Sequence, residues 1–403
     1  MEIKIILLLL VFLAFNYNKC IKLPIGNNPY VKKLRSGHYM IVSSTNITFY
    51  DDTFDTIINS INFEQPIFSY ELNYSFTSGR NQREFTNILS TTVEQFAKED
   101  GNYIVALVNK TIYIFDKFER LILNKFVADY IDFSSPKSFS IITYGHFENN
   151  YYFYILYTSG KNINYTRFNY INHLNEIDIQ EVKSFSMEDK TLSQYSSCGL
   201  MNYNGLKVIN CFYGNSDNSS SSKFEVDGNY QLKITNEEHL GKKRFFGGSR
   251  FYMKVIPDDN KKAFCYIYGG GNYKYFIFDI STNDIVGSAH HFSKKEMAQK
   301  SVFFIDYFYE TKEILIGAIN IENNIYITRF NTKNQSHDLL SYNGDYIKCN
   351  ETRINFILSP NESNYYLLLD ASCYLQQDSL IKSIIATKIS DFPTEFMCHN
   401  YYN

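Results

Sequence analysis

Residues 151–169 read YYFYILYTSGKNINYTRFN, and this stretch contains the pattern that decides the fold. An apolar segment, Tyr151–Leu156, is followed by a polar turn and by a second segment that ends in an aromatic residue and an amide, Phe168-Asn169. Aromatic and β-branched residues favour the pleated, half-buried surface of a sheet. The stretch therefore predicts two adjacent strands, the first of which is apolar on both faces.

The same pattern recurs along the chain. A strand end made of an aromatic residue followed by Asp, Asn or Glu occurs at Tyr50-Asp51, Phe115-Asp116, Phe168-Asn169, Phe224-Glu225, Phe278-Asp279 and Phe330-Asn331. The copies are 65, 53, 56, 54 and 52 residues apart. The apolar strand that precedes them has seven copies, beginning at Tyr39, Tyr103, Tyr151, Leu206, Ala263, Ile314 and Tyr365. Turn signals separate the strands, so each repeat predicts about four short strands in about 50 residues.

Four-stranded units repeated around one axis form a β-propeller, in which neighbouring blades bury each other's sheet faces. The sequence is therefore similar to the β-propeller architecture over Ile21–Ser390, and it predicts an all-β, seven-bladed β-propeller of four-stranded antiparallel blades. The alternative is two or three β-sandwich domains. The blades are expected to start near residues 28, 88, 138, 196, 249, 301 and 352. The chain has no tryptophan, so the signatures of the WD and kelch propeller families are missing.

Three segments fall outside the regular repeat. Residues 65–90 predict an insertion or an irregular connection, because the first interval is longer than the others. Ser379–Ser390 is expected to complete the ring by pairing with the first or the seventh blade, and residues 391–403 form a C-terminal tail. The serine-rich tract Ser216–Ser222 is expected to be a hairpin loop of the fourth unit.

The N-terminus is typical of a signal peptide spanning residues 1–20. Lys4 is followed by the apolar run Ile5–Phe15, which is too short to cross a bilayer, and cleavage is expected just after Cys20. No other segment of the sequence approaches the length of a membrane span. The prediction is a secreted, extracellular chain without a membrane anchor.

N-glycosylation sequons agree with an extracellular location. They begin at Asn46, Asn73, Asn109, Asn164, Asn218, Asn334, Asn350 and Asn361. Four of them are expected in turns, where an oligosaccharide fits: Asn109, Asn164, Asn218 and Asn361.

The cysteines predict structural disulfides. Asn204-Gly205 is a strong signal for a two-residue hairpin turn, which would place Tyr203 opposite Leu206 and Cys198 opposite Cys211. Side chains approach closely in such a pair, so a Cys198–Cys211 disulfide is expected. Cys349 and Cys373 lie symmetrically about a later turn and predict a second disulfide. Cys265 is expected to be a buried free thiol.

Sequence motifs of catalysis, metal binding or cofactor binding are missing, so no catalytic residue, metal or cofactor is predicted. The net charge of −3 and the absence of any block of like charge argue against a nucleic-acid partner. His290-His291 is expected in an exposed loop, and the Asp or Asn after each recurring aromatic is expected to accept backbone hydrogen bonds in a turn.

Two functions remain open at this point. The first is an extracellular recognition or adhesion module, not an enzyme, that binds a protein or glycan ligand through the rim loops of the propeller. The alternative is a secreted hydrolase or lyase acting on polysaccharide, with two or three carboxylates converging at the mouth of the axis. Acidic residues such as Asp51, Asp52, Asp258 and Asp259 are the rim carboxylates that the alternative would use.

Overall fold

A computed structural model describes the strands and most of the turns between Cys20 and Ser390. The residues outside this description are 1–19, 24–29, 44, 53–55, 65–90, 135–137, 188–195, 204, 215–218, 240–249, 257–258, 270–271, 283, 293–303, 309–311, 320–324, 335–336, 343–346, 350–353, 357–363, 370–372, 376–378, 381–383 and 391–403.

Seven four-stranded antiparallel sheets follow one another along the chain, and we number them in that order. Sheet 1 contains β2 (Tyr30–Lys33), β3 (Tyr39–Val42), β4 (Asn46–Tyr50) and β5 (Ile57–Asn62). Sheet 2 contains β6 (Thr92–Gln95), β7 (Ile104–Val108), β8 (Thr111–Phe115) and β9 (Leu121–Phe126). Sheet 3 contains β10 (Ser140–Phe147), β11 (Asn150–Ser159), β12 (Asn162–Ile171) and β13 (Glu176–Ser186). Sheet 4 contains β14 (Ser197–Tyr203), β15 (Leu206–Gly214), β16 (Ser219–Val226) and β17 (Leu232–His239).

The remaining sheets continue the series. Sheet 5 contains β18 (Arg250–Ile256), β19 (Asp259–Gly269), β20 (Asn272–Asp279) and β21 (Asp284–Phe292). Sheet 6 contains β22 (Phe304–Phe308), β23 (Glu313–Ile319), β24 (Ile325–Asn331) and β25 (His337–Tyr342). Sheet 7 contains β27 (Ile354–Phe356), β28 (Asn364–Leu369), β31 (Ile384–Ser390) and β1 (Cys20–Leu23). A small additional sheet contains β26 (Ile347–Cys349), β29 (Cys373–Leu375) and β30 (Ser379–Leu380).

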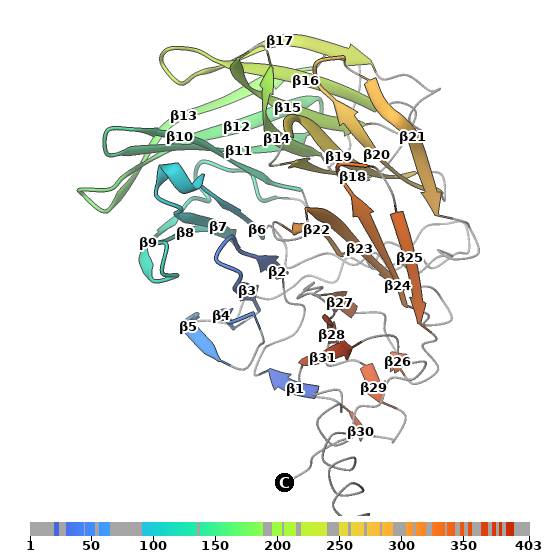
Figure 1. Cartoon of the computed structure of the whole chain (residues 1–403). Helices are drawn as coiled ribbons and strands as arrows, with labels where there is room; N and C mark the ends of the chain where they lie inside the picture. Colours follow the sequence, from blue (N-terminus) through green and yellow to red (C-terminus); the bar gives the residue numbers. More distant parts are fainter. Residues whose placement is uncertain are drawn as a thin grey trace, which may run out of the picture.

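These sheets are the blades of a β-propeller. Figure 1 shows them arranged one after another around a ring, with β6, β18 and β22 nearer the middle and β17, β21 and β25 at the outside. The first strands of neighbouring sheets contact one another, as β6, β10, β14 and β18 do in turn. The fold is therefore all-β with a propeller architecture, as the sequence predicts.

The chain's own N-terminal strand completes the ring. In sheet 7, Ile384–Ser390 pairs with β28 on one side and with β1 on the other, so the last strand of the seventh sheet comes from the beginning of the chain. The predicted role of the C-terminal segment is confirmed for Ile384–Ser390, whereas Ser379–Leu380 belongs to the small additional sheet. Cleavage after Cys20 would leave Ile21–Leu23 paired in β1.

Sheets 2, 3 and 4 bury apolar side chains on both of their faces. Along β11, Phe153 and Ile155 pack against sheet 2, whereas Tyr154 and Leu156 pack against sheet 4. This alternation follows from the pleat, which sends successive side chains to opposite faces of a strand. Over sheets 1 to 5, the described hydrophobic core is therefore divided among the boundaries between neighbouring blades, each of which helps to bury a face of the next.

The recurring aromatic residue is the centre of this packing. Tyr50, Phe115, Phe168, Phe224, Phe278 and Phe330 are all buried, with exposed fractions of 2% or less. Opposite this aromatic, the fourth strand of sheets 1 to 4 contains a one-residue bulge, and the residues skipped in the pairing are Ile58, Ile122, Gln180 and Thr235. A bulge bends and twists an outer strand, which discourages pairing with the edge of another molecule.

Two sequence predictions about sheets 3 and 4 are wrong. Asn164 lies within strand β12, not in a turn, because the turn between β11 and β12 is confined to residues 160–161. Ser219–Ser222 lies in strand β16, not in a loop. The side chains of Ser220, Ser221 and Ser222 are buried, and Ser222 Oγ lies 2.6 Å from the hydroxyl of Tyr213 on the neighbouring strand β15.

Candidate functional site

The two faces of the ring differ in how they are built. In each meander, the turns between the first and second strands and between the third and fourth strands lie at one end of the sheet. We call the side of the ring with these turns the turn face. The opposite side, the connector face, carries the turns between the second and third strands and the links from one sheet to the next. The turn ends of sheets 1 to 4 lie on the same side of the ring, because residues at these ends contact one another: Ser36 contacts Glu119, His146 contacts Asp100, and Lys207 contacts Tyr144.

Four large apolar side chains are exposed on the turn face of sheets 2 to 4. Phe118 lies between β8 and β9, Phe147 ends β10, Leu174 lies between β12 and β13, and Leu206 begins β15. Their exposed fractions are 59%, 57%, 57% and 55%. Contiguous exposed apolar surface is typical of a binding site, so the turns that carry these four side chains are a candidate binding surface.

Buried aromatic residues support these turns at the boundary of sheets 2 and 3. The ring of Tyr103 lies edge-on against Tyr151 and Tyr170, at centroid distances of 4.8 and 5.5 Å. Burial raises the pKa of Tyr170 to about 12, and its hydroxyl donates to Asn172 Oδ1 at 3.1 Å. His146 stacks on Tyr151, and its Nδ1 lies 2.5 Å from Asp100 Oδ1 of sheet 2.

A second aromatic group spans sheets 3 and 4. Tyr152 and Tyr230 stack face to face, with their ring centroids 3.9 Å apart. The Tyr154 hydroxyl donates to the Tyr230 carbonyl at 2.7 Å, and the Arg167 guanidinium donates to the Asn229 carbonyl. Lys207 Nζ donates to the Tyr144 carbonyl at 2.9 Å. These hydrogen bonds fix the β16–β17 turn against sheet 3. The exposed apolar side chains of the turn face are therefore carried by turns and strands that are held in place.

A carboxylate or amide side chain just after the third strand holds several of these turns. Asp116 Oδ1 accepts from the Phe118 and Arg120 amides at 2.8 and 2.9 Å. Asp227 Oδ1 accepts from the Asn229 and Gln231 amides at the same distances. The amides of Ser281 and Lys333 donate in the same way to Asp279 and Asn331. The prediction that the residue after the recurring aromatic satisfies backbone amides is confirmed for Asp116, Asp279 and Asn331. It is wrong for Asn169, which lies within β12 because the strand continues to Ile171, and whose Nδ2 donates to Asn150 Oδ1. Asp227 has the same role, but it follows Val226 at the end of β16 and not the recurring Phe224.

One cluster contains a serine, a histidine and a carboxylate but lacks the arrangement of a catalytic triad. Glu119 is 2% exposed, and its Oε1 accepts from the Ser36 hydroxyl at 2.8 Å and lies 2.7 Å from His38 Nδ1. A nucleophilic serine needs its hydroxyl bonded to a histidine nitrogen. Here Ser36 and His38 both contact the Glu119 carboxylate, so the cluster connects sheet 1 to sheet 2.

An ion pair near the axis of the ring joins two sheets that are not neighbours. Glu94 Oε2 on β6 lies 3.5 Å from Lys254 Nζ on β18, and the two side chains are 29% and 13% exposed. Burial alone would raise the pKa of Glu94, but Lys254, Lys32, the hydrogen bond from the Gln95 amide and Arg35 together lower it to about 2. Among the described residues, the charges that shift the Glu94 pKa are cations, not a second carboxylate.

The ion pair of Glu94 and Lys254 does not supply the paired carboxylates that glycoside hydrolysis requires. Of the rim acids, Asp51 and Asp52 lie after β4, and Asp259 accepts from Lys262 Nζ at 2.6 Å. Asp258 lies outside the described residues. Within the described part of the chain, no group of three His, Cys, Asp or Glu side chains could hold a metal ion. His290 and His291 lie in strand β21, not in an exposed loop as expected.

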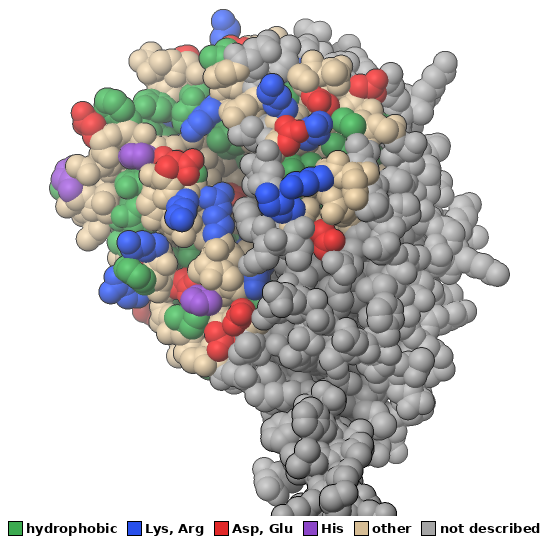
Figure 2. Space-filling view, in the orientation of Figure 1, with side chains coloured by type: hydrophobic (Ala, Val, Ile, Leu, Met, Phe, Trp, Pro, Cys, Tyr) green, Lys and Arg blue, Asp and Glu red, His purple; other side chains and the backbone are tan. Residues whose placement is uncertain are grey.

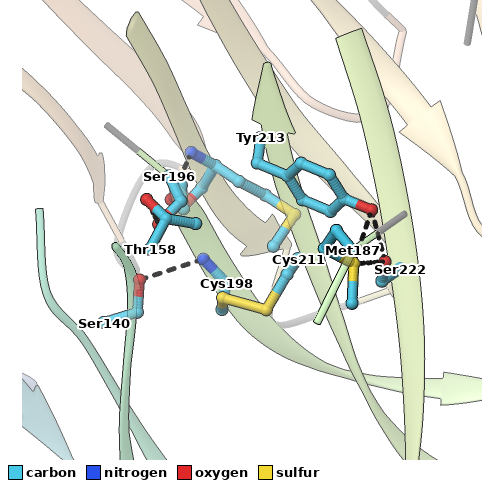
Figure 3. Close-up of a disulfide and its surroundings, with 10 residues drawn as sticks. Ser140, Thr158, Met187, Ser196, Cys198, Cys211, Tyr213 and Ser222 are labelled. Atoms are coloured by element: carbon cyan, nitrogen blue, oxygen red, sulfur yellow. Dashed lines mark hydrogen bonds between the residues drawn. A yellow bond between two sulfur atoms is a disulfide. The ribbon is translucent and has the colours of Figure 1, made fainter. Parts of the chain in front are cut away.

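The structure joins Cys198 and Cys211 in a disulfide (Figure 3). The predicted register is confirmed, since Tyr203 pairs with Leu206 and Cys198 with Cys211 across the turn at Gly205, which has a φ of 78°. Cys349 stands opposite Cys373 in the backbone pairing of β26 and β29, and their disulfide stays a prediction. Cys265 is a buried free thiol, and burial raises its pKa well above the usual value.

The predicted glycosylation sites occupy different environments. Asn109 and Asn334 are exposed, in the β7–β8 and β24–β25 turns, whereas Asn46 and Asn164 are half-buried in β4 and β12. Asn73, Asn218, Asn350 and Asn361 lie outside the described residues. Figure 2 shows one face of the molecule, on which Lys and Arg side chains alternate with acidic and hydrophobic ones.

Comparisons with known proteins find similar folds. No known protein family matches the sequence, and no curated protein matches it. The structure is similar to the WD40 domain of SCAP from fission yeast, with 9% identity, 94% of this chain and 92% of that chain covered, and a TM-score of 0.47. It is similar to the Dos1 propeller, with 9% identity, coverages of 92% and 93%, and a TM-score of 0.46.

A third similar structure is the Aleuria aurantia lectin in complex with Fucalpha1-6GlcNAc. The identity is 10%, 79% of this chain and 96% of that chain are covered, and the TM-score is 0.44.

Among the described residues, no helix has the length and the hydrophobicity that crossing a membrane requires.

Proposed function

We propose that the chain is a secreted, N-glycosylated recognition module that binds an extracellular protein or glycan ligand through the turn face of sheets 2 to 4. The observation that carries the proposal is the exposure of Phe118, Phe147, Leu174 and Leu206 on one side of three consecutive blades. Aromatic side chains are enriched at the centres of interfaces, and a few well-packed residues there supply most of the binding energy.

The rigid base beneath these side chains also supports the proposal. The Tyr152–Tyr230 stack and the hydrogen bonds from Tyr154 and Arg167 fix the β16–β17 turn. Loops that are ordered before binding lose less conformational entropy when the ligand docks. A propeller whose turns are held in this way presents a preformed surface to a partner.

The test begins with a search for the ligand. Residues 21–403, secreted from eukaryotic cells, are screened against arrays of extracellular proteins and of glycans, and the strongest binder is taken as the probe. Phe147→Asp and Leu206→Asp each place a charge in the proposed contact. We expect either variant to weaken binding of the probe at least about tenfold, since anchor residues at the centre of an interface contribute about 2 kcal/mol or more and tenfold corresponds to about 1.4 kcal/mol.

Phe126→Asp is the matched control, because Phe126 is 60% exposed and lies on the connector face. It changes the same side-chain type at the same degree of exposure, so it should leave the affinity unchanged. An array without any binder, or equal losses for Phe126→Asp and Phe147→Asp, would contradict the proposal.

A further inference from the structure

Two exposed aromatic residues stand out on the connector face of sheet 2. Phe126, the last residue of β9, is 60% exposed, and Tyr130, in the link to sheet 3, is 39% exposed. The Tyr130 amide donates to the Val127 carbonyl at 3.0 Å, so a tight turn joins the two aromatic residues. Exposed rings of this size leave apolar surface in contact with water unless another group covers them.

A glycosylation sequon lies next to Phe126. Asn109 is exposed in the β7–β8 turn, where Asn109 and Lys110 have φ angles of 38° and 69°. Thr111, the third residue of the sequon, pairs directly with Phe126 across the sheet. The Val127 amide donates to the Lys110 carbonyl at 2.8 Å, which fixes the aromatic segment against the sequon turn.

A second sequon touches the other end of the same segment. Thr166 is the third residue of the sequon that begins at Asn164, and its hydroxyl donates to the Tyr130 carbonyl at 2.9 Å. Residues 126–130 therefore lie between two sequons that belong to different sheets. Because cross-strand neighbours share one face of a sheet, Thr111 and Phe126 project to the same side.

We propose that an N-glycan on Asn109 packs over Phe126 and Tyr130 and covers the connector face of sheet 2. The apolar face of its first sugar rings would bury the exposed aromatic surface, and its polar edge would remain in water. This inference rests on the secretion and glycosylation in the proposed function, and it names the modification that covers one face of the ring.

The positions of the other sequons indicate which face of the ring the glycans would cover. Asn46 and Asn164 lie at the connector end of their strands, as Asn109 does. No sequon occurs in the turn-face segments of sheets 2 to 4, which are residues 96–103, 116–120, 147–150, 172–175, 203–206 and 227–231. Glycans at Asn46, Asn109 and Asn164 would therefore leave Phe118, Phe147, Leu174 and Leu206 accessible.

The test measures the solvent accessibility of side chains and needs no ligand. The whole chain is secreted from eukaryotic cells, glycan occupancy at Asn109 is measured by peptide mass spectrometry, and the protein is labelled with hydroxyl radicals before and after enzymatic removal of N-glycans. We expect occupancy at Asn109 and a severalfold rise in the labelling rate of Phe126 and Tyr130 after removal. The labelling rates of Phe118 and Phe147 on the turn face should not change.

Asn109→Gln should raise the labelling rate of Phe126 in the otherwise glycosylated protein, because it removes the sugar and keeps the side-chain amide. Asn334→Gln is the matched control, since it removes another exposed sequon in sheet 6 and should leave Phe126 unchanged. A secreted chain that is unoccupied at Asn109, or that shows equal labelling of Phe126 with and without glycans, overturns this inference alone. A chain that is not secreted overturns it together with the proposed function.

Discussion

Glu94 shows how one charged residue can join parts of the ring that lie far apart. Its carboxylate pairs with Lys254, which is 160 residues away in the sequence, and Lys32 and Arg35 add to the positive surroundings. The two partners belong to sheets 2 and 5, so the ion pair crosses the axis between blades that share no boundary. Breaking such a partly buried pair costs more than breaking an exposed one, because the remaining charge loses its partner.

Glu94→Gln is expected to lower the free energy of unfolding by roughly 1–3 kcal/mol at pH 7. The pKa of Glu94 falls from 4.5 to about 2 on folding, so the unfolded chain binds more protons at intermediate pH. The contribution is therefore complete above about pH 4.5 and is lost as the pH falls towards 2. Urea unfolding at a series of pH values measures it, and the difference between wild type and variant should shrink over this range.

Glu99→Gln provides the control for this experiment, because Glu99 is an exposed acid in the short 3-10 helix Lys98–Asp100 of the same sheet. It should change the stability little at any of these pH values. A Glu94→Gln variant with a constant deficit from pH 7 to pH 2 would rule out the ion pair as the source of the stability.

The residue scale also shows why some contacts could be predicted from sequence and others could not. The pairing of Cys198 with Cys211 follows from a two-residue turn, because the turn fixes the register of every pair in the hairpin. The contact between Glu94 and Lys254 has no local signal, since it depends on how all the blades close around the axis. The same is true of Glu119, whose burial against Ser36 and His38 needs two adjacent blades.

At the scale of elements, an Asp or Asn that directly follows the third strand organises the turn to the fourth strand. Asp227 Oδ1 accepts two backbone hydrogen bonds across the β16–β17 turn, and Asp116 does the same between β8 and β9. These bonds replace water at amides that the strands cannot satisfy. Hydrogen bonds to the carboxylate help to keep the pKa of Asp116 below its usual value, against the effect of burial, which raises it.

Asp227→Ala should therefore lower the free energy of unfolding by about 1–2 kcal/mol, since it removes both acceptor bonds from one oxygen. Asp227→Asn keeps the acceptor oxygen and is expected to retain most of the stability, as Asn331 does naturally in sheet 6. Equilibrium urea denaturation compares the three proteins. If Asp227→Ala and Asp227→Asn lower the free energy of unfolding equally, the two hydrogen bonds from the backbone amides are not the cause of the loss.

The sequence predicts the strands better than it predicts their irregularities. The runs of apolar residues identify the second and third strands of sheets 2 to 4, because these strands are buried on both faces. The bulge opposite the recurring aromatic has no sequence signal, since one skipped residue leaves the hydrophobic pattern readable on both sides. The serine tract fails for a related reason: Ser219–Ser222 has the composition of a loop but the environment of a close-packed strand.

At the scale of the whole molecule, the ring depends on a contact between the two ends of the chain. β1 pairs with β31, and Cys20 and Thr387 are the most distant partners in this register. A ring of blades that each lean on two neighbours gains its full stability only when the last boundary forms. Repeats in the sequence predict the number of blades, but they cannot reveal that a strand before the first repeat completes the last blade.

Deletion of Ile21–Leu23 should open this closure. Without β1, the outer edge of β31 loses its backbone hydrogen bonds, and sheet 7 becomes a sheet with an unpaired edge. We expect a lower urea midpoint and faster proteolysis within residues 364–390, with sheets 2 to 4 protected as before. Ile21→Val with Leu23→Val is the control, because it preserves the backbone pairing and the β propensity of the strand. Equal protease resistance of the deletion variant and wild type would mean that sheet 7 is held by its other contacts, and that the ring closes without its N-terminal strand.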